Sequence, residues 1–308
     1  MFATIVGPYP RPDGIDDEAA LRLALGDQLE AEMGILADGN ATPDPDCLAA
    51  WHRADVMARL LAAESGSEPR PVKARLLGPW TAGARAGADR RRRRRAAMAA
   101  ATAGNAQLRA LFAGGAPLVQ VEEDGLAAIE PDDRAGHRLA IDALMALLDG
   151  VEGHVSLSIN GGDASGAGPG VLYAAPFSSH GFDLIAGPDG WRVAQRAPRE
   201  RGLILGVTDC RTAARDYVPL SVWAARYGAS MGARGQERIG LAPSAGLERL
   251  PLDVARVKLR RLAEAATVAG MPDEAMRDAM PKEALTRGGP PGRMLVPRRR
   301  GAAADTPE

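Results

Sequence analysis

Polar and acidic side chains follow several short apolar runs of this sequence, at the places where strands would end. They are Tyr9, Arg11, Asp38, Asn40, Trp80, Thr81, Glu122, Glu123, Asp124, His154, Ser156, Asn160, Asp209, Cys210 and Ser244. Carboxylate, imidazole, thiol and hydroxyl groups gathered in one place could bind a small substrate and move its protons. Each of them taken alone could equally be a helix cap or a loop hydrogen-bond partner.

The densest acidic cluster is Glu122-Glu123-Asp124. Adjacent strand residues point to opposite faces, so Glu122 and Asp124 share one side and Glu123 takes the other. A carboxylate facing a cleft could hold a substrate ammonium group or, with a raised pKa, transfer a proton. We therefore treat Glu122 and Glu123 as catalytic candidates, with solvent-facing loop acids as the alternative.

His154 and Ser156 lie two residues apart, on one face of a predicted strand. A His-x-Cys pair at this spacing would supply half of a zinc site, but a neutral serine hydroxyl is a poor zinc ligand. The residues alone therefore favour a hydrogen-bonding or packed His154. Cys210, which follows Asp209, stays open as a metal ligand, a nucleophile or a small buried residue.

Two further segments are distinctive in composition. The glycine-rich stretch from Asn160 to Gly170 lacks a Walker lysine and a dinucleotide fingerprint, so we interpret it as a mobile loop that could act as a lid. The run Arg90 to Arg95 has no interleaved aromatic residues, which favours a solvated surface patch at a helix start over a nucleic-acid or phosphate site.

Short β-like runs alternate with helical patterns along most of the chain. The predicted strands are 4–6, 35–37, 72–77, 117–121, 154–159, 182–186, 202–207 and 239–242. The predicted helices are 15–33, 47–63, 96–112, 133–148, 191–195, 220–231 and 252–269. This alternation predicts a single-domain (β/α)8 TIM barrel over residues 1–270, with an open doubly wound sheet as the alternative. Residues 271–308 are predicted to form a partly disordered C-terminal extension.

Composition limits the function classes. The 308 residues include 46% hydrophobic residues, and 38 basic against 39 acidic residues give a net charge of −1. This balance argues against nucleic acid or membrane partners held by bulk charge, and leaves a small-molecule substrate as the expected partner. Two cysteines, no signal-peptide pattern and no membrane-length apolar run predict a soluble cytoplasmic protein. The oligomeric state stays open.

Seven segments, taken in order, resemble one family. They are Ile5 to Pro12, Asp38 to Asn40, Lys73 to Thr81, Val119 to Glu123, His154 to Ser156, Gly206 to Asp209 and Leu241 to Leu247. Together they look like the C-terminal catalytic barrel of cobalamin-independent methionine synthase, in the superfamily shared with uroporphyrinogen decarboxylase. The resemblance covers roughly residues 3–270. It implies a TIM barrel and methyl-transfer chemistry, with substrate contacts from the strand-end residues given above.

The resemblance also implies a zinc site that this chain changes. The family binds zinc through a His-x-Cys pair, a later Glu and a last Cys. His154 corresponds to the histidine, but Ser156 and Ser244 stand at the two cysteine positions, and no Glu occurs at 185–188. We therefore expect that the protein binds no zinc. We expect Glu122, Glu123, His154 and Asp209 to be the catalytic residues.

Trp80 lies in the segment that lines the family's folate site, so a pterin could stack on it. We expect a methyl- or alkyl-transferase that acts on a small thiol or other small nucleophile, with methyl-tetrahydrofolate as the candidate donor. The alternatives are a zinc-free lyase or decarboxylase of the superfamily and a non-catalytic small-molecule-binding barrel.

Overall fold

A single parallel sheet forms the centre of the molecule. The computed structural model describes residues 1–281 except 88 and 188. The strands are β1 (Phe2–Ala3), β2 (Ala74–Leu77), β3 (Val119–Glu122), β4 (Val155–Ile159), β5 (Ser179–Asp183), β6 (Gly202–Thr208) and β7 (Ile239–Pro243). Their order is β1-β7-β6-β5-β4-β3-β2, and each neighbouring pair is parallel.

Two isolated parallel bridges close this sheet into a barrel. Thr4, just after β1, pairs with Ile35, and Leu36 pairs with Val72, just before β2. The segment around Ile35 and Leu36 is therefore the remaining strand of the barrel, shortened to two bridges. The predicted (β/α)8 barrel is confirmed, and the open-sheet alternative is wrong because β1 and β2 are linked through this segment.

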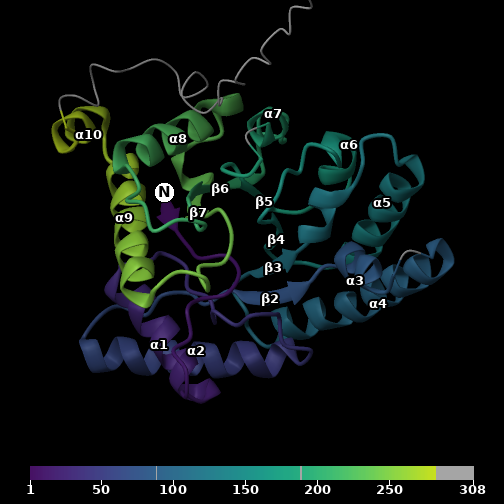
Figure 1. Cartoon of the computed structure of the whole chain (residues 1–308), viewed down its shortest axis with the longest axis horizontal. Coiled ribbons are helices and arrows are strands. Elements are labelled where there is room, and N and C mark those ends of the chain that lie inside the picture. Colours follow the sequence, from purple (N-terminus) through teal and green to yellow (C-terminus); the bar gives the residue numbers. More distant parts are fainter. Residues whose placement is uncertain (88, 188, 282–308) are drawn as a thin grey trace, which may run out of the picture.

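Helices cover the outside of the barrel (Figure 1). They are α1 (Asp17–Glu30), α2 (Cys47–Ser65), α3 (Pro79–Arg85), α4 (Arg90–Ala113), α5 (Arg134–Leu148), α6 (Gly168–Leu172), α7 (Gly190–Ala194), α8 (Val218–Ser230), α9 (Leu252–Gly270) and α10 (Asp273–Ala279). Three short 3-10 turns, η1 (Asp124–Ala128), η2 (Met231–Ala233) and η3 (Gln236–Arg238), complete the described elements. Within the described ranges, none of the helices has the length and apolar character needed to cross a membrane.

Several element boundaries differ from the predicted ones, and two of the differences matter most here. The sixth strand was expected at 182–186 but spans Ser179–Asp183, because Asp183 Oδ1 accepts the amides of Ile185 and Ala186, both at 2.8 Å, and turns the chain there. Disorder was expected after residue 271, but α10 lies in that stretch and buries Met276. The rest of the predicted extension, residues 282–308, lies outside the described residues.

The arginine run forms the first turns of α4, where Asp89 Oδ1 accepts the amide of Arg92 at 2.7 Å. Arg90 and Arg94 are exposed. Arg90 lies 3.8 Å from the carboxylate of Asp133, just before α5, and Arg94 lies 3.7 Å from that of Asp142 on α5. The expected solvated patch at a helix start is consistent with this placement.

Side-chain alternation gives the barrel an unusual interior. The outward residues of the strands, such as Val119, Val121 and Leu157, pack under the helices in the main hydrophobic core. Barrel interiors are usually filled by bulky branched residues. Here a small separate cluster of Val6, Ile204 and Ala242 lies inside. The other inward positions include six polar side chains, namely Lys73, Arg75, Gln120, Glu122, Ser156 and Ser158.

Candidate functional site

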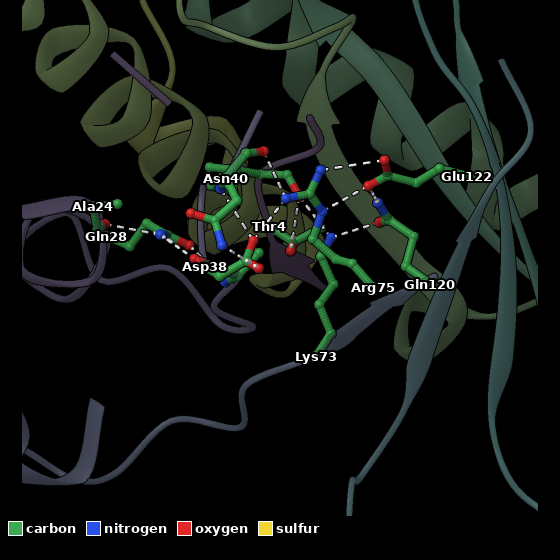
Figure 2. A network of polar contacts seen from close by, with 11 residues as sticks. Thr4, Ala24, Gln28, Asp38, Asn40, Lys73, Arg75, Gln120 and Glu122 are labelled. Atoms are coloured by element: carbon green, nitrogen blue, oxygen red, sulfur yellow. Dashed lines mark hydrogen bonds and ion pairs between the residues drawn. The ribbon is translucent and has the colours of Figure 1, made fainter. Parts of the chain in front are cut away.

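The carboxyl end of the barrel contains a buried ion-pair network around Arg75 (Figure 2). Its Nε lies 2.7 Å from Glu122 Oε1 and its Nη2 lies 3.2 Å from Glu122 Oε2. Its Nη1 donates to Asp38 Oδ1 at 2.6 Å and to the Asn40 carbonyl at 2.8 Å. One guanidinium therefore joins β2, β3 and the loop that follows Leu36.

This network pairs a buried cation with two carboxylates. Burial alone would lower the pKa of Arg75, but Glu122 and Asp38 outweigh it and raise that pKa. Gln120 Nε2 also donates to Glu122 Oε1 at 3.1 Å. The structure thus brings together Asp38, Asn40 and Glu122 as expected. Both carboxylate oxygens of Glu122 contact Arg75, so its geometry suits a residue that positions other groups.

Arg75 is a member of this site that sequence reasoning missed. The available signal was a charged residue inside the apolar run 72–77, at an inward position of the predicted strand. A guanidinium on a buried face requires carboxylate partners, and the neighbouring strand offers one.

Glu123 has a different role from the one expected. Its Oε1 accepts the Trp80 amide at 2.8 Å, and its Oε2 accepts the Thr81 amide at 2.7 Å and the Thr81 hydroxyl at 2.6 Å. Burial raises its pKa to about 7 against these hydrogen bonds. A Cβ on Gly78 would lie only 2.1 Å from Glu123 Cδ. Glu123 therefore caps the first turn of α3, and the expectation that it is catalytic is corrected.

Trp80 and Thr81 lie in the helical layer and do not face the mouth. Trp80 is 3% exposed, and its Nε1 donates to the Gly125 carbonyl at 3.0 Å. Arg93 covers the ring at 5.7 Å from the centroid. The Thr81 hydroxyl, besides donating to Glu123, accepts the Gly125 amide at 3.0 Å. The substrate-binding expectation for both residues is corrected, because their polar atoms serve the α3 turn.

Tyr9 and Arg11 also serve the scaffold. Tyr9 is buried, its hydroxyl donates to Asp27 Oδ2 at 2.9 Å, and burial together with Asp27 raises its pKa. Arg11 is exposed and pairs with Asp17 at 2.6 Å, at the start of α1. Neither residue points to the polar network, so the expectation that they bind substrate is corrected.

The loop after β4 crosses the carboxyl mouth. The amide of Asn160 donates to Asp124 Oδ1 at 2.9 Å, and the next amide, of Gly161, donates to the Ser244 carbonyl at 3.2 Å. Desolvation raises the pKa of Asp124 to about 6. The structure therefore places Asp124, Asn160 and Ser244 at one end of the barrel, as predicted, and joins the ends of β3 and β7 through this loop.

Cys210 and Asp209 belong to the loop that follows β6. The Cys210 thiol is buried and donates to the Ala245 carbonyl at 3.1 Å, and burial raises its pKa. The Asp209 oxygens accept the Arg211 amide at 2.9 Å and the Thr212 hydroxyl at 2.8 Å. Of the three alternatives for Cys210, the small buried residue fits best, and Asp209 shapes its loop.

Asp183 is a second residue that sequence reasoning missed. It ends β5 with its carboxylate buried, and its Oδ2 has no hydrogen-bond partner among the described residues. Only Arg211 Nη2 approaches, at 3.6 Å. Burial raises the pKa of Asp183. The strand was predicted at 182–186, which placed Asp183 inside it. Asp183 was therefore not counted among the residues at strand ends.

Ser244 lies next to Asp183 across β6. Its hydroxyl is likewise buried and without a partner in the described part of the chain. Gly206 separates the two residues, since a Cβ there would lie 3.1 Å from Ser244 Cα and 3.2 Å from Asp183 Cα. The missing side chain lets the backbones of Asp183 and Ser244 approach from either side of β6.

His154 lies at the opposite end of the barrel. It precedes β4, where its carbonyl accepts the Val119 amide at the start of β3, and its Nε2 lies 3.0 Å from Ser179 Oγ. Desolvation lowers its pKa. Ser156 faces the interior from the early part of β4. The expectation that these residues share a mouth with Ser244 is wrong, because they begin a strand whereas Ser244 follows one.

The carboxyl end does not fit a family-type zinc site. Among the described residues, no group of three or more His, Cys, Asp or Glu side chains is placed to hold a metal ion. Ser156 lies near the start of β4, the inward residue near the end of β4 is Ser158, and the residue after β7 is Ser244. Asp183 and the Cys210 thiol lie near this end, but Glu122 and Asp38 are paired with Arg75, and the neutral hydroxyls that stand at the family's cysteine positions do not replace thiolates.

Comparison with known proteins supports the fold. No protein-family model matches the chain, and no curated protein matches it. The B12-independent methionine synthase from Shewanella sp. W3-18-1, solved in complex with selenomethionine, superimposes with a TM-score of 0.68 at 16% identity, over 86% of this chain and 96% of that one.

Two other solved structures agree with this assignment. A Listeria monocytogenes protein, provisionally described as a vitamin-B12-independent methionine synthase, gives a TM-score of 0.67 at 12% identity, over 88% of this chain and 98% of that one. A dihydrodipicolinate synthase gives 0.51 at 10% identity, over 93% and 81%. The chain is a TIM barrel with the fold of B12-independent methionine synthases.

Proposed function

We propose that this chain transfers a methyl or other alkyl group to a small thiol or another small nucleophile, without zinc, at the carboxyl end of the barrel. The observation that carries the proposal is that two neighbouring residues, Asp183 and Ser244, each bury an oxygen that has no hydrogen-bond partner among the described residues, with Arg211 Nη2 3.6 Å from the Asp183 oxygen. The fold shared with methionine synthases supports the reaction class.

Asp183 is the general base in this proposal. A thiol bound at the mouth gives its proton to Asp183 Oδ2, and the sulfur forms a bond to the methyl carbon of the donor. The bond between that carbon and the donor breaks, and Asp183 returns the proton to the leaving group. The pKa of Asp183 is raised by burial, which makes this carboxylate a better proton acceptor than an exposed aspartate.

The Arg75 network holds the other part of the substrate. Asp38 Oδ1 accepts a hydrogen bond from Arg75 Nη1, and Asp38 Oδ2 accepts one from Asn40 Nδ2 at 3.1 Å. Asp38 and Asn40 also line a groove of about 840 Å³ along α1 and α2, which offers a path from solvent. In our proposal these two residues bind a polar or cationic group of the substrate at the end of that groove.

The loop after β4 controls access to Asp183. Gly161 has a φ of +75°, which favours glycine, and its amide holds Ser244 across the mouth. A Cβ at Gly162 would lie 2.7 Å from Ala127 Cβ. Opening of this loop admits the substrate and its closure excludes water, as in other enzymes with lid loops.

The test uses isotope-labelled methyl-tetrahydrofolate and a panel of small thiols, with chelator-treated full-length protein. We expect labelled methyl thioether by mass spectrometry, and a fall of about 10²–10⁴-fold in its rate for Asp183→Asn. Asp209→Asn is the matched control, because that acid already bonds its own loop, and its rate is expected to stay within a few fold.

The other outcomes separate the alternatives. Transfer that needs added zinc, or that survives Asp183→Asn unchanged, would overturn the proposal. Conversion of a substrate without any methyl donor would indicate a zinc-free lyase instead. Binding without turnover would indicate a non-catalytic barrel.

A further inference from the structure

The amino end of the barrel contains a cavity that the proposed function does not use. Its volume is about 720 Å³, which is the size of a small-molecule site. Strand-start residues line it, and the exposed residues Glu200, Glu237 and Arg238 surround its opening. It therefore enters the barrel from the side opposite to Asp183 and Ser244.

The wall of this cavity is largely apolar, with a few polar groups at its inner end. The apolar part includes Phe2, Ile35, Leu118, Phe177 and Ile204. The polar part includes Thr4, Lys73, Gln120, Ser156 and Ser179. An apolar wall with a few converging polar groups is the usual composition of a small-molecule site.

Lys73 is the reactive group in this cavity. It is 3% exposed, and its Nζ donates to the Ile5 carbonyl at 2.6 Å and to Gln120 Oε1 at 2.7 Å. The contact between Lys73 and Gln120 is visible in Figure 2. Two acceptors use both N–H bonds of a neutral amine and leave its lone pair free. No carboxylate among the described residues lies within ion-pair distance of this nitrogen, so the ammonium form has no direct counter-charge.

Lys258 provides the contrast. It is 2% exposed, but its Nζ lies 2.9 Å from Asp216 Oδ2 and 2.9 Å from the Ala214 carbonyl. Lys258 therefore has a carboxylate in direct contact with its nitrogen, whereas Lys73 has none within ion-pair distance in the described residues. For Lys73, by comparison, burial and nearby Arg75 lower the pKa to about 7, against the opposing effect of Glu122 and Asp38.

Ser156 adds a hydrogen-bond donor to the same cavity. It is 1% exposed, and its hydroxyl has no partner among the described residues. A buried hydroxyl without a partner is costly unless a ligand satisfies it. Ser158, two residues further along β4, instead donates to Asn160 Oδ1 at 3.0 Å.

We propose that this amino-end cavity binds a small carbonyl compound with an apolar body and that Lys73 captures it as an imine. The nitrogen lone pair attacks the carbonyl carbon, a C–N bond forms, and the C–O bond breaks. Both amine protons leave with the oxygen as water. The Ser156 hydroxyl donates to the carbonyl oxygen as negative charge develops on it.

The test treats the full-length protein at neutral pH with benzaldehyde and sodium cyanoborohydride, which reduces an imine to a stable benzylamine. The chain has three lysines, Lys73, Lys258 and Lys282, so peptide mass spectrometry resolves every side-chain amine. We expect Lys73 to be labelled at least about tenfold faster than Lys258, since Lys73 lines the cavity and has no carboxylate partner, whereas Lys258 is paired with Asp216.

Two serine variants form a matched pair on one strand. Ser156→Ala is expected to slow labelling of Lys73 about fivefold to tenfold, whereas Ser158→Ala leaves it unchanged. Thermal unfolding of each variant checks that the fold is kept. Labelling of Lys73 no faster than that of Lys258 would overturn the proposal, and equal rates in the two serine variants would overturn the role of Ser156. Because the probe needs no methyl donor, this result is independent of the transferase assay.

Discussion

Inward-facing residues at the two ends of the barrel form two different chemical environments. At the carboxyl end, acids and hydroxyls lie near a loop that crosses the mouth, and the atoms without a hydrogen-bond partner in the described residues are Asp183 Oδ2 and the Ser244 hydroxyl. At the amino end, an apolar cavity leads to an amine, and the unpartnered group is the hydroxyl of Ser156. TIM-barrel chemistry is normally placed at the carboxyl end, with the amino end kept for stability.

Arg75 and its partners separate the two ends. The guanidinium and its carboxylates lie between the amino-end cavity and the carboxyl mouth, on the same inward face as Lys73. Because Arg75 is held by Glu122 and Asp38, neither end can draw on it as a free cation. The atoms without a hydrogen-bond partner at the two ends, Asp183 Oδ2 and the hydroxyls of Ser244 and Ser156, all lie outside this network.

The largest expected effect is on stability, from Arg75→Met. The change leaves the Glu122 and Asp38 carboxylates buried without their counter-charge, so the free energy of unfolding should fall by about 3–5 kcal/mol in a urea titration. Arg53→Met is the control, because Arg53 pairs with Asp44 at an exposed site and should change stability little. A cost no greater than that of the control would show that the network does not divide the barrel.

The next effect is on the pH dependence of Lys73 reactivity. Only the neutral amine reacts, so acylation of Lys73 by acetic anhydride should rise about tenfold per pH unit at low pH and level off above about pH 7. An ordinary lysine keeps rising toward pH 10. The charged groups around Lys73 are Arg75, Glu122 and Asp38, with His154 at the cavity opening.

A reactivity that still rises steeply at pH 9 would contradict this expectation. It would mean that Lys73 stays charged in the folded protein and that the amino end cannot form an imine at neutral pH.

The smallest effect is expected at Trp80. Trp80→Phe keeps most of the packing in the helical layer and should leave ligand binding at both ends within about twofold, with a stability cost below about 1.5 kcal/mol. Fluorescence titration with methyl-tetrahydrofolate gives a direct reading. Strong quenching that disappears in Trp80→Phe would place the ring in a ligand site and contradict its assignment to the α3 turn.

The sequence predicted the architecture well because strand and helix patterns alternate with few interruptions. It also predicted correctly that Asp38, Asn40, Glu122 and Ser244 lie at one end, since each follows a strand. His154 was placed at the wrong end because a strand start was grouped with strand ends. Its true position depends only on where β4 begins, at Val155.

Other site features could not be read from the sequence. Glu122 and Glu123 are identical in type, and only the α3 turn, with its free amides, makes one of them a helix cap. Arg75 and Lys73 look alike as basic residues on a strand, yet one is ion-paired and the other is not. Which polar groups remain unpartnered depends on three-dimensional packing, and sequence spacing does not encode it.

The most direct test of whether the two ends of the barrel act independently measures methyl transfer and benzaldehyde labelling of Lys73 in the same variant, Asp183→Asn. The variant should lose methyl transfer by about 10²–10⁴-fold while benzaldehyde labels Lys73 at the wild-type rate, because the changed carboxylate lies at the opposite end from the cavity. A parallel loss of both, in a variant that unfolds at the wild-type temperature, would show that the barrel has one connected site and would contradict the account.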